Sequence, residues 1–171
     1  YNTNVLNPYR DEFARGELQA NYEKAYKSFE NAPQPKIIAS RVNVDIYPYQ
    51  HELRTSGSFT LRNKTGAPQS EVYIGLLEAA TIRKLQGSIP MRAGDVRRDL
   101  GWLPYTLERP LAPGETMTLD FEIDYLPHGF TNDGARTLVV DNGTFVNSQL
   151  FPALGYQAGV EITNDNERKK H

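Results

Sequence analysis

The sequence predicts an all-β protein, an antiparallel β-sandwich that carries one N-terminal α-helix. Two observations lead to this fold class. Apolar and polar residues alternate over Thr116–Tyr125 (TMTLDFEIDY), and shorter alternating segments recur between turns rich in Gly, Pro and Asn. A period of two places alternate side chains on opposite faces of a strand. Several such strands at short spacing are typical of a sandwich.

Size and composition are those of one globular domain. The chain has 171 residues, of which 39% are hydrophobic and 23% charged, and a net charge of −2. Binding to nucleic acid or to an anionic membrane surface needs a surplus of basic residues, so this charge argues against both. The sequence has no cysteine, which excludes disulfides, thiol catalysis and zinc–thiolate sites.

The first predicted element is a helix over Asp11–Phe29, a segment without Pro that is rich in Glu, Lys, Ala and Leu. Its apolar residues recur at helical spacing and form one stripe: Leu18, Tyr22, Ala25 and Phe29. The sequence NAPQP at residues 31–35 ends the helix, because Pro cannot continue it. We expect this helix to dock on the sheet or to link to a preceding domain. A partner-binding amphipathic helix is the alternative.

Alternating β segments follow from Lys36 onward. The predicted strands are, in chain order, Arg41–Ile46, Phe59–Leu61, Val72–Leu76, Thr81–Leu85, Trp102–Leu107, Thr116–Tyr125, Thr137–Val140 and Thr144–Leu150. Arg92–Leu100 has mixed charges and no period, so it is predicted to be a loop.

The predicted organisation has three parts. Residues 1–35 form the N-terminal helix and a linker, residues 36–160 the β-sandwich domain, and residues 161–171 the start of a connection to a following domain that the sequence does not contain. The chain begins with Tyr rather than Met and stops in a charged run, NDNERKKH. We therefore interpret it as a fragment of a larger protein.

No metal site is predicted from the histidines. His51, His128 and His171 are dispersed along the chain. The pair His51-Glu52 begins like the zinc-peptidase motif H-E-x-x-H, but Thr55 stands where the second histidine would be, so the helical ligand pair is missing.

Three acids, Asp120, Glu122 and Asp124, share one face of the strand predicted over Thr116–Tyr125. Alternate residues of a strand lie about 7 Å apart, so these acids could mimic a general acid–base pair. A cryptic hydrolase built near Asp124 is the least favoured hypothesis, because alternation alone accounts for all three acids. We interpret them as a solvated polar face of the sheet.

Three longer segments, taken in order, resemble parts of one known domain. They are IIASRVNVDIYPYQHELRTSGSFTLRNKTGAPQSEVYIGLL, then LERPLAPGETMTLDFEIDYLPHGF with its proline-glycine turn and long strand ending in Tyr, and then GTFVNSQLFPALGYQ. Together they resemble the N-terminal β-domain of zinc aminopeptidases of the aminopeptidase N family. The resemblance covers residues 36–156, and its last segment is similar to the one that leads to the catalytic domain.

The N-terminal part has a more particular resemblance. YNTNVLNPYRDEFARGELQANYEKAYKSFENAPQPKI is similar to the region after the last membrane helix in bacterial proteins that join an ABC-transporter permease to an aminopeptidase-like domain. The closing NDNERKKH resembles the point where their peptidase part begins. The resemblance implies a membrane-anchored parent protein, preceding membrane helices in the same chain, and an extracytoplasmic location for this domain.

The family's zinc ligands and catalytic Glu belong to a following domain, and no position of this sequence matches them. The resemblance therefore implies a chain that is not itself an enzyme, with zinc bound in the absent peptidase domain of an aminopeptidase-like parent. We expect the β-domain to pack against that peptidase domain and to shape access to its cleft. The alternative function is a free-standing β-sandwich module that binds carbohydrate or protein.

One substrate-binding residue is implied by the resemblance. Family members use a Gln in the last segment of this domain to help hold the free amino group of the substrate. Gln149 is the nearest candidate, although its surroundings depart from the family's Thr-Gln-x-Glu form. An ordinary polar residue at the end of a strand is the alternative interpretation.

Overall fold

The computed structural model describes residues 11–126, 139–140, 143–144 and 146–171. The helices and strands, in chain order, are α1 (Glu12–Tyr26), β1 (Lys36–Tyr47), β2 (Glu52–Arg62), β3 (Gln69–Gly75), β4 (Ala80–Gly87), β5 (Met91–Ala93), β6 (Trp102–Leu111), β7 (Thr116–Tyr125), β8 (Val139–Val140), β9 (Gly143–Thr144), β10 (Ala153–Leu154) and α2 (Asp165–Arg168). Short 3₁₀ turns are η1 (Lys27–Phe29), η2 (Pro48–Gln50), η3 (Arg98–Leu100), η4 (Ser148–Leu150) and η5 (Ala158–Val160).

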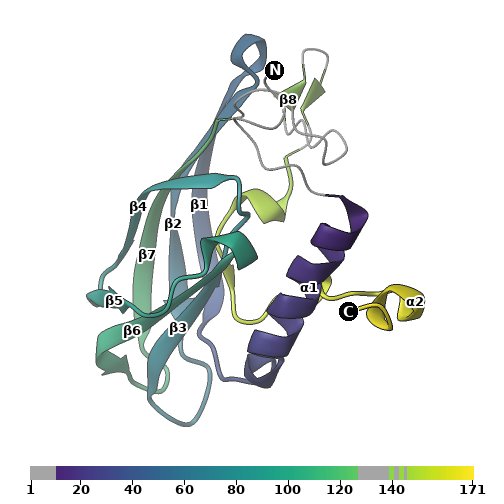
Figure 1. The fold of residues 1–171 in the computed structure, drawn as a ribbon. Coiled ribbons are helices and arrows are strands. Elements are labelled where there is room, and N and C mark those ends of the chain that lie inside the picture. Colours follow the sequence, from purple (N-terminus) through teal and green to yellow (C-terminus); the bar gives the residue numbers. More distant parts are fainter. Residues whose placement is uncertain (1–10, 127–138, 141–142, 145) are drawn as a thin grey trace.

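Two four-stranded antiparallel sheets form the sandwich, and the predicted fold class is confirmed. The first sheet has the order β1-β2-β7-β4, and the second has the order β10-β3-β6-β5. In Figure 1 the second sheet lies in front of the first, and α1 stands beside them, next to the C-terminal segment. The described part of the chain contains no helix long and apolar enough to cross a bilayer.

The main core lies between the two sheets, and β7 contributes most regularly to it. Met117, Leu119, Phe121 and Ile123 are buried, as the alternating sequence predicts. The predicted strand Thr116–Tyr125 and β7 have the same bounds. Burial of such side chains supplies about 1.5–3 kcal/mol each, which makes β7 a main contributor to the stability of the sandwich.

The helix α1 starts one residue later than predicted, because the side chain of Asp11 caps it by accepting a hydrogen bond from the Ala14 N–H (2.7 Å). After Tyr26 the chain tightens into η1, which ends at Phe29 as the sequence predicts for the helix. The predicted apolar stripe is correct except for Ala25, which is exposed.

A second face of α1, which the stripe does not include, is also buried. Gly16 and Ala20 lie on it, and they face the C-terminal segment of the chain. A Cβ on Gly16 would stand 2.3 Å from the Nε2 atom of His171, so a larger residue there would displace the His171 ring. The helix is therefore held from two sides, by the second sheet and by the C-terminal segment.

Two predicted elements differ from the structure. Thr144–Leu150 was predicted to be a strand, but η4 forms there because the Asn147 side chain accepts a hydrogen bond from the Gln149 N–H (3.0 Å) and turns the chain. The predicted loop Arg92–Leu100 overlaps β5, which pairs with β6, and ends in η3. Of the predicted strand Thr137–Val140, the first two residues lie outside the described part of the chain.

Candidate functional site

Gln149, the substrate-binding candidate, lies in η4 between two anchored residues. On one side Asn147 caps the turn, and on the other the Tyr125 hydroxyl donates a hydrogen bond to the Leu150 carbonyl oxygen (3.1 Å). Gln149 itself is exposed, whereas Leu150 is buried. Burial raises the pKa of Tyr125 above its usual 10.0, so its hydroxyl stays protonated and keeps donating. The turn thus presents Gln149 to the surface on a fixed backbone, and its role in substrate binding stays a prediction.

The three acids of β7 do not form an acid–base pair, and one of them is not solvated as predicted. Asp124 is buried (7% exposed) and accepts a hydrogen bond from the Arg83 Nε atom of β4 at 2.8 Å. The pairing of β4 with β7 shifts register between Ile82 and Lys84, and Arg83 lies at this irregularity. Glu122 remains exposed, as predicted. Asp124 is therefore a paired structural carboxylate that connects two neighbouring strands.

The described histidines lie in separate places. The Nδ1 atom of His51 is 3.2 Å from the Val139 carbonyl oxygen, and its backbone has a positive φ of 55° at the end of η2. The ring of His171 packs on Phe13, with 4.6 Å between ring centroids. His128 lies outside the described residues. In the described part of the chain no group of three or more histidine and acid side chains could hold a metal ion.

Most of the aromatic residues near α1 are enclosed in a small second core. This aromatic cluster consists of residues from α1, η1, the second sheet and the C-terminal segment: Tyr22, Tyr26, Phe29, Tyr73, Trp102 and Tyr156. Trp102 is only 2% exposed, and it stacks on Tyr26 and Tyr73 with centroid separations of 4.4 Å and 5.1 Å. Trp102 therefore cannot stack on a sugar, and its fluorescence reports on the docking of α1.

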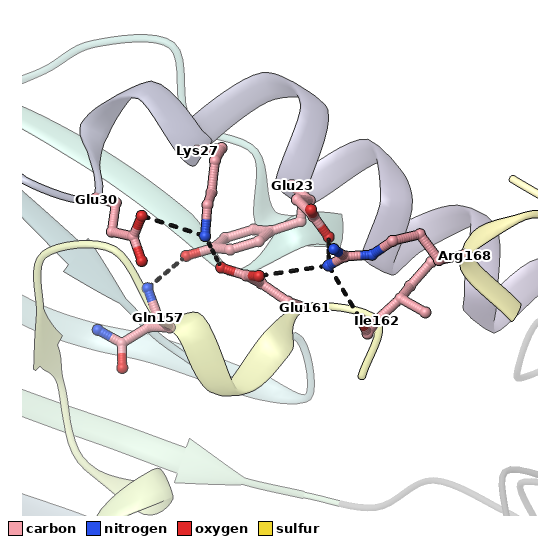
Figure 2. Close-up of polar contacts among 8 residues, drawn as sticks. Glu23, Lys27, Glu30, Gln157, Glu161, Ile162 and Arg168 are labelled. Atoms are coloured by element: carbon pink, nitrogen blue, oxygen red, sulfur yellow. Dashed lines mark hydrogen bonds and ion pairs between the residues drawn. The ribbon is translucent and has the colours of Figure 1, made fainter. Parts of the chain in front are cut away.

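Charged and polar contacts join α1 and η1 to the C-terminal segment, and we call them the α1 clamp (Figure 2). Lys27 pairs with Glu161 at 2.6 Å and with Glu30 at 3.2 Å. Arg168 pairs with Glu23 at 2.9 Å and lies 3.6 Å from Glu161. Glu161 thus receives a cation from each side, and its side chain is only 15% exposed.

A neutral hydrogen bond completes the α1 clamp. The Gln157 N–H donates to the Tyr22 hydroxyl oxygen at 2.8 Å, and Tyr22 is 2% exposed. The hydrogen bond from Lys27 lowers the pKa of Glu161, whereas burial raises the pKa of Tyr22. Of the clamp residues only Tyr22 is singled out by the sequence, as part of the apolar stripe. Lys27 and Glu161 lie 134 positions apart, and nothing local connects them.

The strand β1 has the largest exposed apolar surface of the first sheet. Its residues that point toward the second sheet are identified by pairing: Val44 and Ile46 lie opposite the buried Thr55 and Leu53 of β2. We call these inward-pointing residues the β1 row: Ile37, Val42, Val44 and Ile46. Unlike β2, the strand is exposed along nearly its whole length, because the second sheet does not cover it.

The exposure of the β1 row is considerable for apolar side chains. Ile37 is 42% exposed, Val42 40% and Ile46 39%, whereas Val44 is partly buried against the core. Single exposed apolar residues are ordinary, but several on one face of a strand are typical of a surface that another body covers. The alternation predicted for this strand is present in the sequence, yet its apolar face is not buried within the described chain.

Comparisons with known proteins give structural matches only. No protein-family model and no curated protein matches the chain. Solved structures that it resembles include a two-domain M1 zinc metallopeptidase mutant bound to L-tryptophan, with 20% identity over 58% of this chain and a TM-score of 0.45. Another is an M1 zinc metallopeptidase mutant from Deinococcus radiodurans bound to a Tyr-Ser-Ala substrate, with 21% identity over 56% and a TM-score of 0.44. This chain covers 22% and 21% of those chains, respectively.

Proposed function

We propose that this chain is the non-catalytic β-domain of a membrane-anchored, zinc-aminopeptidase-like protein, and that it packs against the peptidase domain through the β1 row. The exposed apolar row carries the packing part of the proposal. Ile37, Val42 and Ile46 are about two-fifths exposed in the chain by itself. Covering apolar surface contributes about 25 cal/mol per Å², so a following domain placed there would be stabilised by the contact.

The sequence supports the family part of the proposal. Residues 36–156 carry the three ordered segments that resemble the β-domain of the aminopeptidase N family, and no position matches that family's zinc ligands. On this proposal zinc and the catalytic groups belong to the peptidase domain, and membrane helices precede the chain as part of a permease fusion. Gln149 would reach toward the amino group of a bound peptide.

The coding sequence on either side of the chain tests the family assignment. The proposal expects apolar spans before Tyr1 and an H-E-x-x-H motif with a later Glu after His171. A stop codon directly after His171 would overturn it. The 171-residue chain should not release an amino acid from a chromogenic aminoacyl substrate when zinc is added, and zinc-dependent release would contradict the non-catalytic role.

Lysine substitutions in the β1 row test the packing. Val42→Lys and Ile46→Lys change positions that are already exposed, so the free energy of unfolding of the 171-residue chain should fall by less than about 1 kcal/mol. In the longer protein the same substitutions would bury a charge at the domain contact. We expect a lower thermal midpoint and faster limited proteolysis between the domains.

The matched control for these variants is Thr118→Lys. Thr118 is an exposed residue on β7, on the outer face of the same sheet. The Thr118→Lys substitution should change neither the free energy of unfolding of the 171-residue chain nor the thermal midpoint of the longer protein. Equal effects of Thr118→Lys and Ile46→Lys on the longer protein would contradict packing through the β1 row.

One observation favours the alternative of a free-standing binding module. Tyr49, in the turn between β1 and β2, is 92% exposed, and Tyr47 next to the turn is 37% exposed. Tyrosines exposed in this way can stack on a sugar ring or anchor a protein contact. A titration with glycans followed by NMR of the tyrosine rings separates the two functions. Saturable shifts at Tyr49 that Tyr49→Ala abolishes would favour the module.

A further inference from the structure

The outer edge of β1 offers backbone groups that nothing in the described chain uses. β1 lies at the end of the first sheet, and its one described neighbour is β2. No backbone hydrogen bond of the described residues reaches the other edge of this strand. An edge strand of 12 residues with free N–H and C=O groups is a template for another strand.

The regular part of this edge is centred on one residue. A register shift between Ile37 and Ala39 disturbs the start of β1, and pairing with β2 is regular from Ala39 to Tyr47. Asn43 is the midpoint of this nine-residue stretch. A regular segment with a central residue can pair with a copy of itself around a two-fold axis.

The side chains around Asn43 are complementary to themselves when the strand is reversed. The sequence of residues 41–45 is RVNVD. In an antiparallel pair of two copies about Asn43, Arg41 lies opposite Asp45 of the other copy, and Val42 lies opposite Val44. Directly opposed side chains point to the same face of a sheet and interact, so the Arg41–Asp45 pair forms twice in the dimer.

The two charged side chains are available for such a contact. Arg41 and Asp45 are exposed, and neither forms an ion pair or a side-chain hydrogen bond with the other described residues. Within one chain Arg41 lies opposite Ser58, which has no charge, and Asp45 lies opposite Arg54, which pairs with Glu52 at 3.5 Å. A second copy of β1 places an opposite charge directly across from both Arg41 and Asp45.

We propose that β1 pairs antiparallel with β1 of a second copy of this chain about Asn43, and that the first sheets of the two copies join into one continuous sheet. The interface is isologous, with backbone hydrogen bonds along the edge, an Arg41–Asp45 pair at each end and two Val42–Val44 contacts on the inner face. The pairing shares Val42 and Val44 with the β1 row, but it is argued from the backbone edge and the charges of β1 and not from a following domain. It therefore does not depend on the function proposed above.

A cysteine at the two-fold axis tests the register. The chain has no native cysteine. In the proposed dimer residue 43 faces itself, and opposed Cβ atoms lie about 4.5–5.5 Å apart, close enough for a disulfide after small adjustment. Asn43→Cys should give a covalent dimer under mild oxidation. Ser40→Cys is the matched control. Residue 40 of one copy would lie opposite residue 46 of the other, so the two introduced cysteines would be about 20 Å apart and should not crosslink.

Charge reversal tests the side-chain pairing by sedimentation equilibrium. Arg41→Asp and Asp45→Arg each place like charges opposite one another twice, so each should weaken the wild-type dimer by about tenfold. An equimolar mixture of the two variants should dimerise again, because the opposed positions 41 and 45 would then carry opposite charges at both ends of the pair. Circular dichroism of each variant verifies its fold.

Three results would overturn the proposal. The first is wild-type chain that stays monomeric at every concentration reached. The second is equal crosslinking of the two cysteine variants. The third is a mixture of the charge-reversed variants that associates no better than either alone.

Discussion

Removal of one hydroxyl group from Tyr22 tests whether α1 belongs to the cooperative fold. Tyr22→Phe keeps the ring, which is 2% exposed and lies 5.1 Å from the ring of Tyr156. It deletes the oxygen that accepts the Gln157 N–H at 2.8 Å. The variant therefore isolates a single contact between the helix and the C-terminal segment.

The expected magnitude follows from the burial of this contact. A neutral hydrogen bond contributes about 0.5–1.5 kcal/mol, and a buried donor left without a partner costs about 1–3 kcal/mol. Because Gln157 is only partly buried, water can replace part of the lost bond, and we expect a loss of about 1–1.5 kcal/mol. Tyr22→Ala also removes the ring and should cost about 3–5 kcal/mol. Tyr49→Phe is the control, because its hydroxyl belongs to a residue that is 92% exposed.

Urea unfolding followed by two signals measures this loss. Far-UV circular dichroism reports the sheets and helix, and fluorescence reports the single Trp102, which stacks on Tyr26 of α1 at 4.4 Å. We expect one coincident transition, shifted to lower urea in Tyr22→Phe and unchanged in Tyr49→Phe. A fluorescence transition well before the dichroism transition in the wild-type chain would refute the reasoning, because α1 would then unfold separately.

Three further predictions concern the charged residues and the candidate site. The hydrogen bond from Lys27 lowers the pKa of Glu161 below its usual 4.5, so its stabilisation is present above pH 4.5 and is lost as the pH falls through the lowered pKa. In calorimetry the thermal midpoints of wild type and Glu161→Gln should therefore converge below pH 4.5, and a constant difference would contradict this. Asp124→Ala should cost about 1 kcal/mol in urea unfolding, because Arg83, whose side chain is 58% exposed, loses its carboxylate partner. Exposed Glu122→Ala should cost less than about 0.5 kcal/mol. Gln149→Ala should leave the stability of the chain unchanged and raise KM for aminoacyl substrates in the longer protein, and an unchanged KM would rule out its proposed role.

The strands of this fold could be predicted where the pattern is local. The bounds of β7 follow from strict alternation, and the helix is apparent from its spacing and from the Pro residues after Phe29. The turn at η4 could not be predicted as a turn, because the apolar residues around it resemble a strand. Its cause is one side chain, Asn147, which bonds the backbone two residues further on.

Contacts between distant segments account for the rest. Asp124 pairs with Arg83, which lies at a register shift in β4, and alternation within β7 cannot indicate this contact. The α1 clamp forms because the C-terminal segment returns along the helix. Gly16 alone does not predict this contact, because its neighbour His171 is 155 positions away in the sequence. The exposure of β1 depends on how far the second sheet extends, and the sequence of β1 itself alternates like that of a buried strand.

The accessibility of Ile46 tests the central claim, that the β1 row packs against a following domain. Because the chain has no cysteine, Ile46→Cys and the control Thr118→Cys can each be labelled at one site in dilute solution with a thiol reagent. The account predicts rapid labelling of both cysteines in the 171-residue chain. In the longer protein, with all other cysteines removed, labelling should be strongly slowed at position 46 but not at position 118. Equally rapid labelling at position 46 in both proteins would contradict it.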